Sequence, residues 1–196
     1  MYPSTKQALR QVFREKRASL SSSDFRRLND QLLAQVKTLT LDSCLTVHLF
    51  LPIEGHKEPD TYTIATWMRK QYPGIRLVLP KTEARSYRMT HILWEKGTMV
   101  EVNRWGIPEP VAGLVIQPDE IDVVFIPLLI FDEHGHRVGY GKGFYDRFLA
   151  TCRPTTQMIG LSLFEAVTAI ADVSDYDVAM DLCVTPTQVW SFTTKA

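Results

Sequence analysis

Apolar residues recur at intervals of three and four in two segments near the start of the chain, which is the spacing of one helix face. The first segment predicts a helix over Thr5 to Arg17, and Ser4 with Gln7 has the spacing of a capping box at its start. The second predicts a helix that begins after the serines at positions 21–23. The apolar faces consist of Leu9, Val12 and Phe13 in the first helix and of Phe25, Leu28, Leu32, Leu33, Val36 and Leu39 in the second.

Later in the chain, short apolar runs bounded by proline, glycine or polar residues predict buried strands. The most apolar run, residues 121–131, is predicted to be a central strand. Residues 61–72 predict a helix between the first two strands, and FYDRFLA (Phe144 to Ala150) predicts the first turns of another, whereas Trp105 to Pro110 is predicted to be a loop. The predicted strands are Leu45 to Pro52, Ile75 to Pro80, Tyr87 to Leu93, Gly113 to Ile116, Ile121 to Phe131, Met158 to Leu163 and Asp181 to Pro186.

The alternation of strands with helices predicts an α/β fold with a mostly parallel sheet and helices on both faces. No repeat or linker divides the sequence, so residues 1–196 are predicted to form a single domain. In parallel sheets ligands bind at the carboxyl ends of the strands. A binding site is therefore expected in the loop that follows residues 121–131.

Composition and charge exclude several classes of protein. The chain has 22 basic and 22 acidic residues, which argues against a protein that coats nucleic acid, and no run of 18 apolar residues predicts a membrane span. Residues 1–27 are basic and serine-rich like an organelle transit peptide, but their helical periodicity favours a structured helix. The cysteines, Cys44, Cys152 and Cys183, have neither disulfide nor zinc-site spacing, so we expect a reducing, cytoplasmic location.

A glycine-rich segment, RVGYGKGFYDR (Arg137 to Arg147), follows the most apolar strand. Its glycines at positions 139, 141 and 143 permit positive φ and close approach of a ligand, and Lys142 and Arg137 add positive charge, so a phosphate site is predicted in preference to a flexible turn. The segment is not a Walker A loop, because His136 stands at the position of the first glycine and Gly143 follows the lysine. Its GxGxG spacing also differs from the dinucleotide fingerprint.

Charged residues elsewhere leave alternatives open. Four basic residues share one face of the first helix, and this face could be a solvated stripe, a membrane surface or an RNA-binding surface. Asp146 could bind magnesium, or could cap a helix or pair with Arg147 or Arg137. His134 and His136 have no nucleophile at a recognisable spacing, so a triad hydrolase is not supported. The basic residues are Lys6, Arg10, Arg14 and Arg17, and the late acidic residues that could add a metal ligand are Asp172, Asp175, Asp177 and Asp181.

Five segments, in order along nearly the whole chain, together resemble the 5-formyltetrahydrofolate cyclo-ligase family, also called methenyltetrahydrofolate synthetases. The resemblance implies an α/β fold of the type shared with ribose-phosphate isomerase and coenzyme A transferases. It also implies an enzyme that uses ATP and Mg²⁺ to convert 5-formyltetrahydrofolate to 5,10-methenyltetrahydrofolate, with release of ADP and phosphate. The segments are KQALR (Lys6 to Arg10), FLPIEGHKEPDT (Phe50 to Thr61), WGIPEP (Trp105 to Pro110), FDEHGHRVGYGKGFYDR (Phe131 to Arg147) and DVAMDLCVTP (Asp177 to Pro186).

The resemblance implies roles for individual residues. Lys142 and Arg137 would be catalytic, and Asp146 and Asp177 would bind magnesium, with Asp181 as an alternative to Asp177. The implied ATP-binding residues are Lys6, Arg10, Arg137, Val138, Gly139, Tyr140, Gly141, Lys142, Gly143, Phe144 and Tyr145. The implied folate-binding residues are Leu51, Glu58, Trp105, Tyr140, Gly141, Lys142, Gly143 and Phe144.

The sequence departs from the family pattern at two places. The link between Leu51 and Glu58 is about two residues longer than the family pattern, so Glu54 is an alternative for the glutamate role. Phe144 and Tyr145 replace a pair of tyrosines, which keeps a ring for stacking on a pterin but removes one hydroxyl.

The implied mechanism begins with attack of the formyl oxygen on the γ-phosphate, after which the second folate nitrogen attacks the activated carbon and phosphate leaves. We expect a monomer that binds ATP and 5-formyltetrahydrofolate, with neither nucleic acid nor membrane as a partner. Two other functions fit parts of the sequence. A sugar-phosphate isomerase or acyl transferase would use the glycine loop without ATP, and a non-enzymatic RNA-binding relative would use the basic first helix.

Overall fold

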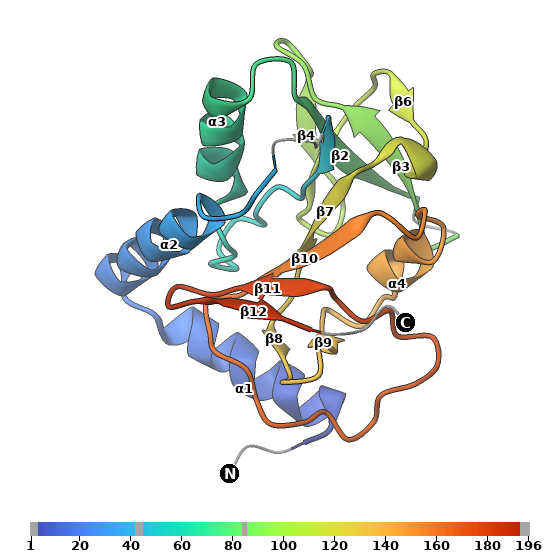
Figure 1. The fold of residues 1–196 in the computed structure, drawn as a ribbon. Coiled ribbons are helices and arrows are strands. Elements are labelled where there is room, and N and C mark those ends of the chain that lie inside the picture. The colour runs from blue at the N-terminus through green and yellow to red at the C-terminus, as the bar shows by residue number, and fades with distance from the viewer. Residues whose placement is uncertain (1–3, 42–44, 84–85, 193–196) are drawn as a thin grey trace.

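The computed structural model describes residues 4–41, 45–83 and 86–192, which form a layered α/β fold around one large sheet (Figure 1). The strand order in this sheet is β12-β11-β10-β7-β1-β2-β3-β6. Its five central strands, from β11 to β2, run parallel, and β12, β3 and β6 are antiparallel to their neighbours. The strands are β1 (Thr46–His48), β2 (Arg76–Glu83), β3 (Arg88–Leu93), β6 (Val115–Ile116), β7 (Val123–Pro127), β10 (Gln157–Leu161), β11 (Leu182–Val184) and β12 (Val189–Ser191).

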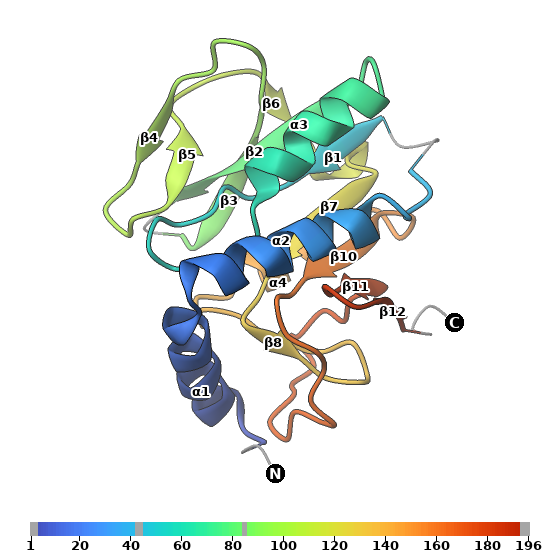
Figure 2. The same cartoon turned by 90° about the vertical axis from the view of Figure 1, so that its left-hand side faces the viewer.

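Helices cover both faces of the sheet, as predicted (Figure 2). On one face lie α2 (Ser22–Val36) and α3 (Thr61–Gln71), and on the other lies the short α4 (Phe144–Leu149). Consecutive residues of β7 alternate between the two cores, with Phe125 on the side of α2 and α3 and Val124 on the side of α4. Burial on both faces explains why this strand is continuously apolar in the sequence.

The first helix, α1 (Lys6–Ser19), packs beyond the end of the sheet rather than on its face (Figure 1). Leu9 and Phe13 share a small core with β8 (Ile130–Phe131) and β9 (Arg137–Val138). The N-cap is Thr5, whose side chain accepts a hydrogen bond from the backbone of Ala8, so the predicted capping box at Ser4 is wrong by one residue.

Two of the predicted elements differ from the structure. The predicted strand over residues 121–131 is divided, because β7 ends at Pro127 and β8 pairs antiparallel with β9 in a separate two-stranded sheet. Proline has no N–H with which to continue a ladder. The predicted loop over residues 105–110 contains β5 (Pro108–Pro110), which pairs with β4 (Val100–Val102).

The strands β4 and β12, three residues each, were not predicted from the sequence, because they are too short to show a periodicity. A short 3-10 helix, Pro118–Glu120, precedes β7. Cys44 lies outside the described residues. Within the described ranges, no helix has the length and apolar character needed to cross a membrane.

Two buried histidines lie beneath α4. The rings of His48 on β1 and His91 on β3 have their centroids 5.2 Å apart, and the Phe148 ring lies 4.0 Å from His91 and 4.8 Å from His48. Neither ring nitrogen of His48 has a hydrogen-bond partner in the described part of the chain. Burial lowers the pKa of His48 well below its usual value and lowers the pKa of His91 to about 4. Both histidines are therefore neutral in the fold.

We predict that the free energy of unfolding falls as the pH is lowered from 6.5 to 4. In this window the unfolded chain binds a proton on each histidine, whereas folded His91 remains neutral, so unfolding takes up protons and is favoured by acid. His91 alone should contribute roughly 3 kcal/mol, at about 1.4 kcal/mol for each unit of its lowered pKa. Urea denaturation of wild type, His91→Gln and the exposed control His134→Gln measures the effect. An unchanged pH slope in His91→Gln would contradict this account.

Candidate active site

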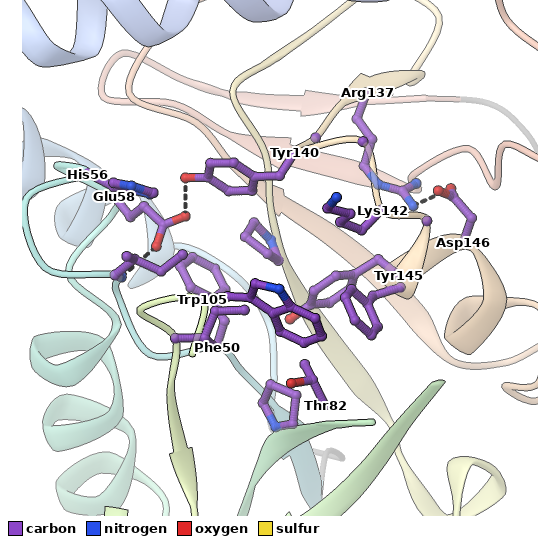
Figure 3. Close-up of a pocket in the computed structure, with 18 of the residues that line it drawn as sticks. Phe50, His56, Glu58, Thr82, Trp105, Arg137, Tyr140, Lys142, Tyr145 and Asp146 are labelled. Atoms are coloured by element: carbon purple, nitrogen blue, oxygen red, sulfur yellow. Dashed lines mark hydrogen bonds and ion pairs between the residues drawn. The ribbon is translucent and has the colours of Figure 1, made fainter. Parts of the chain in front are cut away.

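A cavity of about 470 Å³ lies at the carboxyl ends of β1, β2 and β7 (Figure 3). Phe50 and Leu51 follow β1, Thr82 belongs to β2, and Pro127 ends β7. The loop between β9 and α4 and one face of α1 also line it. This is the edge of the sheet at which the sequence predicted a site.

The glycine segment, residues 139–143, lines the cavity along its whole length. Gly141 and Gly143 have φ values of +85° and +69°, which side chains with a Cβ rarely adopt. A Cβ on Gly143 would lie 2.8 Å from the guanidinium of Arg147, and one on Gly141 would lie 3.3 Å from that of Arg10. The backbone conformation therefore favours glycine at these two positions, and a larger residue would also displace the neighbouring arginine side chain.

The basic face of α1 turns toward this cavity. Lys6, Arg10 and Arg14 line it, and Nε of Arg10 donates a hydrogen bond to the Gly139 carbonyl at 2.9 Å. Arg17 is only 3% exposed and does not reach the cavity wall. Of the four basic residues, Arg17 is thus buried, Lys6 and Arg10 are partly buried, and Arg14 is exposed.

Arg137 and Asp146 form an ion pair on the same side of the cavity. The guanidinium of Arg137 also donates to the Val178 carbonyl. Burial lowers the pKa of Arg137, and the charges of Asp146 and Asp177 oppose this effect. The salt bridge that the sequence left open for Asp146 is made with Arg137, whereas Arg147 donates to the Lys142 carbonyl at 3.0 Å.

Asp177 also lines the cavity, where it forms an ion pair with Lys6. Partial burial raises the pKa of Asp177, but hydrogen bonds from Lys6 and Ser174 outweigh it and lower the pKa overall. Asp181 lies away from the cavity, and its carboxylate accepts a hydrogen bond from the Met158 backbone at 2.7 Å. Of the two alternatives, the geometry favours Asp177 as the residue at the site.

The opposite half of the cavity holds a buried carboxylate. Glu58 is 3% exposed, and its two oxygens accept hydrogen bonds from the Ile53 backbone at 2.7 Å and from the Tyr140 hydroxyl at 2.5 Å (Figure 3). Glu54, its alternative in the sequence, is exposed and does not line the cavity. Although the link between Leu51 and Glu58 is longer than the family pattern, Glu58 therefore still lies at the site.

Aromatic rings also line the cavity. The Trp105 and Phe144 rings meet edge to face with centroids 5.8 Å apart, and Phe50 and Tyr145 lie beside them (Figure 3). The Tyr145 hydroxyl is buried, and burial followed by the charge of Glu58 raises the pKa of Tyr145, so this phenol stays protonated.

One residue implied for the nucleotide site lies elsewhere. The side chain of Val138 is fully buried against Leu9 and Phe13 of α1, and its carbonyl accepts a hydrogen bond from the Leu129 backbone at 2.8 Å. Val138 therefore supports the loop and does not line the cavity. The other residues implied for ATP, folate and magnesium all line it.

The sequence did not assign several residues that line the cavity. Most of them stand within segments that carried the family resemblance or at the carboxyl ends of strands, so these two signals could have found them. Arg14 lies on the basic face of the first helix, which was a third signal. Met89 had none of these signals, because it belongs to the antiparallel strand β3. The unassigned residues are Arg14, Phe50, Ile53, His56, Pro80, Thr82, Met89, Ile107 and Pro127.

A glycine-rich loop with clustered basic side chains, facing a buried carboxylate and aromatic rings, forms a concave site of mixed polar and apolar character, as small-molecule sites in α/β enzymes do. The chain matches the 5-formyltetrahydrofolate cyclo-ligase family over residues 3–186 and belongs to this family. The predictions of the family, of an enzyme and of a mostly parallel α/β fold are confirmed.

Named relatives agree with this assignment. The chain is 26% identical to the 5-formyltetrahydrofolate cyclo-ligase of Escherichia coli K12, over 92% of this chain and 100% of the relative. It is 29% identical to the enzyme of that name from Mycoplasma pneumoniae, over 91% and 97% of the two chains. The NMR structure of 5,10-methenyltetrahydrofolate synthetase from Aquifex aeolicus superposes with a TM-score of 0.77 and 27% identity, covering 97% of this chain and 94% of that one. The family and its relatives indicate 5-formyltetrahydrofolate cyclo-ligase activity.

We predict that Asp146→Asn destabilises the fold, because it leaves the buried Arg137 guanidinium without its counter-charge. Breaking a fully buried pair costs roughly 3–5 kcal/mol. Because the Asp146 side chain is 31% exposed, we expect a loss of about 2 kcal/mol in the free energy of unfolding. Urea denaturation checks this value.

The double variant Arg137→Met/Asp146→Asn should lose less stability than the sum of its single changes, since no buried charge remains unpaired. Asp175→Asn, at an exposed position, is the control. Equal losses in Asp146→Asn and Asp175→Asn would show that the ion pair does not stabilise the fold.

Proposed function

We propose that this protein catalyses the ATP- and magnesium-dependent conversion of 5-formyltetrahydrofolate to 5,10-methenyltetrahydrofolate, with release of ADP and phosphate. The observation that carries the proposal is the division of one cavity into two chemically different halves. A cationic, glycine-lined half suits a triphosphate, and an aromatic half with one buried carboxylate suits a pterin.

The charge and the shape of the cationic half both suit a phosphate group. Lys6, Arg10, Arg137 and Lys142 lie around the glycine segment, whose backbone allows oxygens to approach closely. Lys142 is exposed to the cavity and has no acidic partner among the described residues. It is therefore the cation most available to a transferring phosphoryl group.

Asp146 and Asp177 fit a magnesium ion that is bound together with nucleotide phosphates. No group of three or more His, Cys, Asp and Glu side chains forms a metal cluster in the described ranges. Magnesium in nucleotide sites commonly takes one or two carboxylates and completes its shell with phosphate oxygens and water, so two carboxylates near Arg137 are a suitable donor set. When bound, the ion supplies positive charge against the phosphate oxygens.

The aromatic half is matched to folate. A pterin has two apolar faces and a polar edge, and the Trp105, Phe144 and Phe50 rings offer apolar surface beside the Glu58 carboxylate. Glu58 can accept hydrogen bonds from N–H groups on the pterin edge and so orient the ring. Leu51, next to Phe50, adds to the apolar surface.

The reaction needs activation of a poor leaving group, because the formyl oxygen belongs to an amide. That oxygen attacks the γ-phosphorus, the bond to the bridging oxygen breaks, and its electrons leave with ADP. The neighbouring folate amine then attacks the formyl carbon and releases its proton, while the carbon–oxygen bond breaks and the oxygen leaves in phosphate. Lys142 and Arg137 stabilise negative charge on the transferring group, and the shared cavity holds the two substrates in reach of each other.

The direction of the basic side chains supports this proposal over an RNA-binding function. Lys6 is about one-fifth exposed and paired with Asp177, and Arg10 is hydrogen-bonded to the glycine segment. An RNA-binding surface needs basic groups that reach solvent phosphates. Lys6 and Arg10 instead have partners inside the cavity, and Arg14, the exposed member of this face, lies 5.5 Å from the Tyr140 ring centroid.

The direct test mixes purified protein with 5-formyltetrahydrofolate and magnesium ATP and follows the near-ultraviolet absorbance of the methenyl product. Growth of this band only when ATP is present, and its loss when a chelator removes magnesium, are the expected results. A folded protein that binds ATP but forms no product would contradict the folate proposal and favour a sugar-phosphate isomerase or an acyl transferase.

We predict that Lys142→Ala lowers kcat by about 100-fold or more while the protein remains folded, because removing one donor from a developing negative charge costs roughly this much. Lys142 is exposed, so its loss should not disturb packing. Steady-state kinetics and a thermal melt measure both effects. Lys96→Ala, an exposed lysine outside the cavity, is the control. Near-normal turnover in Lys142→Ala would remove the glycine segment from the mechanism.

A further inference from the structure

We propose that Tyr140 and Arg17 are positioning residues that fix the Glu58 carboxylate for folate binding and thereby join the nucleotide half of the cavity to the folate half. The proposal rests on the proposed function, in which Glu58 orients the pterin. Neither Arg17 nor the Tyr140 hydroxyl was given this role by the sequence, and Arg17 does not line the cavity.

The side chains form a continuous hydrogen-bonded series. Arg17 donates from Nη2 to the Tyr140 hydroxyl, and this hydroxyl donates to one oxygen of Glu58 at 2.5 Å (Figure 3). The other oxygen of Glu58 accepts from the Ile53 backbone at 2.7 Å. With one donor on each oxygen, the plane of the buried carboxylate is fixed from two sides.

The direction of this series follows from the chemistry of its members. A guanidinium has donors only, so the hydroxyl oxygen of Tyr140 must accept from Arg17 and its single proton must point elsewhere. The carboxylate of Glu58 is the acceptor in that direction. Burial, followed by the charge of Glu58, raises the pKa of Tyr140, which keeps the phenol protonated and able to donate.

Arg17 and Tyr140 are themselves held in place. Arg17 is almost completely buried, and a second nitrogen of its guanidinium donates to the Leu128 carbonyl at 3.2 Å. The Tyr140 ring stacks on His56 with centroids 5.7 Å apart, and the guanidinium carbon of Arg14 lies 5.5 Å from the ring centroid. The hydroxyl therefore has little freedom to leave Glu58.

Tyr140 connects the two halves of the cavity, because its backbone belongs to the nucleotide half and its side chain reaches the folate half. The backbone belongs to the glycine segment, where the preceding carbonyl, that of Gly139, accepts from Arg10 at 2.9 Å. The side chain crosses to Glu58 in the folate half (Figure 3). If the glycine segment moved, the Tyr140 hydroxyl that holds the Glu58 carboxylate would move with it. The helix α1 contacts the segment through Arg10 and the hydroxyl through Arg17.

Tyr140→Phe is the decisive variant, because it keeps the ring and removes only the hydroxyl. Loss of a hydrogen bond to a buried carboxylate should raise the KM for 5-formyltetrahydrofolate by roughly tenfold, with the KM for ATP changed by less than about twofold. Arg17→Met should also raise the KM for 5-formyltetrahydrofolate. If Arg17 acts through the hydroxyl, Arg17→Met/Tyr140→Phe should be no worse for this KM than the more severe single variant.

Tyr176→Phe, at a tyrosine that is 88% exposed, and Arg26→Met, on the exposed face of α2, are the matched controls. A general structural defect would instead lower the melting temperature and affect both substrates. Should Arg17→Met fail to fold, Tyr140→Phe alone decides the role of the hydroxyl.

Three results would count against the proposal, each in a different way. An unchanged KM for 5-formyltetrahydrofolate in Tyr140→Phe, with normal turnover in wild type, would overturn the positioning role and leave the proposed function intact. Additive effects in the double variant would overturn the link from Arg17 through Tyr140. Absence of turnover in wild type would refute the proposed function and, with it, this role.

Discussion

Burial of β7 on both faces is the constraint on which the rest of the structure depends. Its side chains alternate between the core beneath α2 and α3 and the core beneath α4, so the strand must lie in the middle of the sheet with helices on both sides. Pro127 ends the strand, and the chain then leaves the sheet toward the β8 and β9 hairpin. The cavity lies where these parallel strands end, because side chains no longer fill both layers there.

The hairpin in turn determines where α1 lies. Leu9 and Phe13 pack on it, and the same rotation of the helix that buries them directs Lys6 and Arg10 toward the glycine segment. Charges gathered in one cavity repel each other unless they have partners. Arg137 pairs with Asp146 and Lys6 with Asp177, whereas Arg10, Arg14 and Lys142 have no acidic partner among the described residues. The cavity wall therefore keeps an excess of positive charge beside the segment.

The sequence predicted the parts of this arrangement that depend on local pattern. Helix faces, the β-α-β unit and the glycine segment follow from spacing, and the resemblance to the family carried Glu58 and Asp146 to positions that do line the cavity. The sequence did not predict the features that depend on contacts between segments far apart in the chain. Pro127 marks the end of β7 within the apolar run, but nothing in the run shows that β8 belongs to a different sheet. The sequence also does not show that Val138 leaves the cavity wall, because this follows from its packing against α1.

The contact between Tyr140 and Glu58 illustrates the same limit and gives the cavity its organisation. The two residues are 82 positions apart, and no spacing rule relates them. Tyr140 stands between two glycines, of which Gly141 has a positive φ, and its side chain reaches Glu58. A buried carboxylate without donors would be costly, so the hydroxyl from the glycine segment stabilises Glu58 in the fold as well as orienting it. In this chain, the same hydrogen bond that makes burial of Glu58 tolerable also connects the two halves of the cavity.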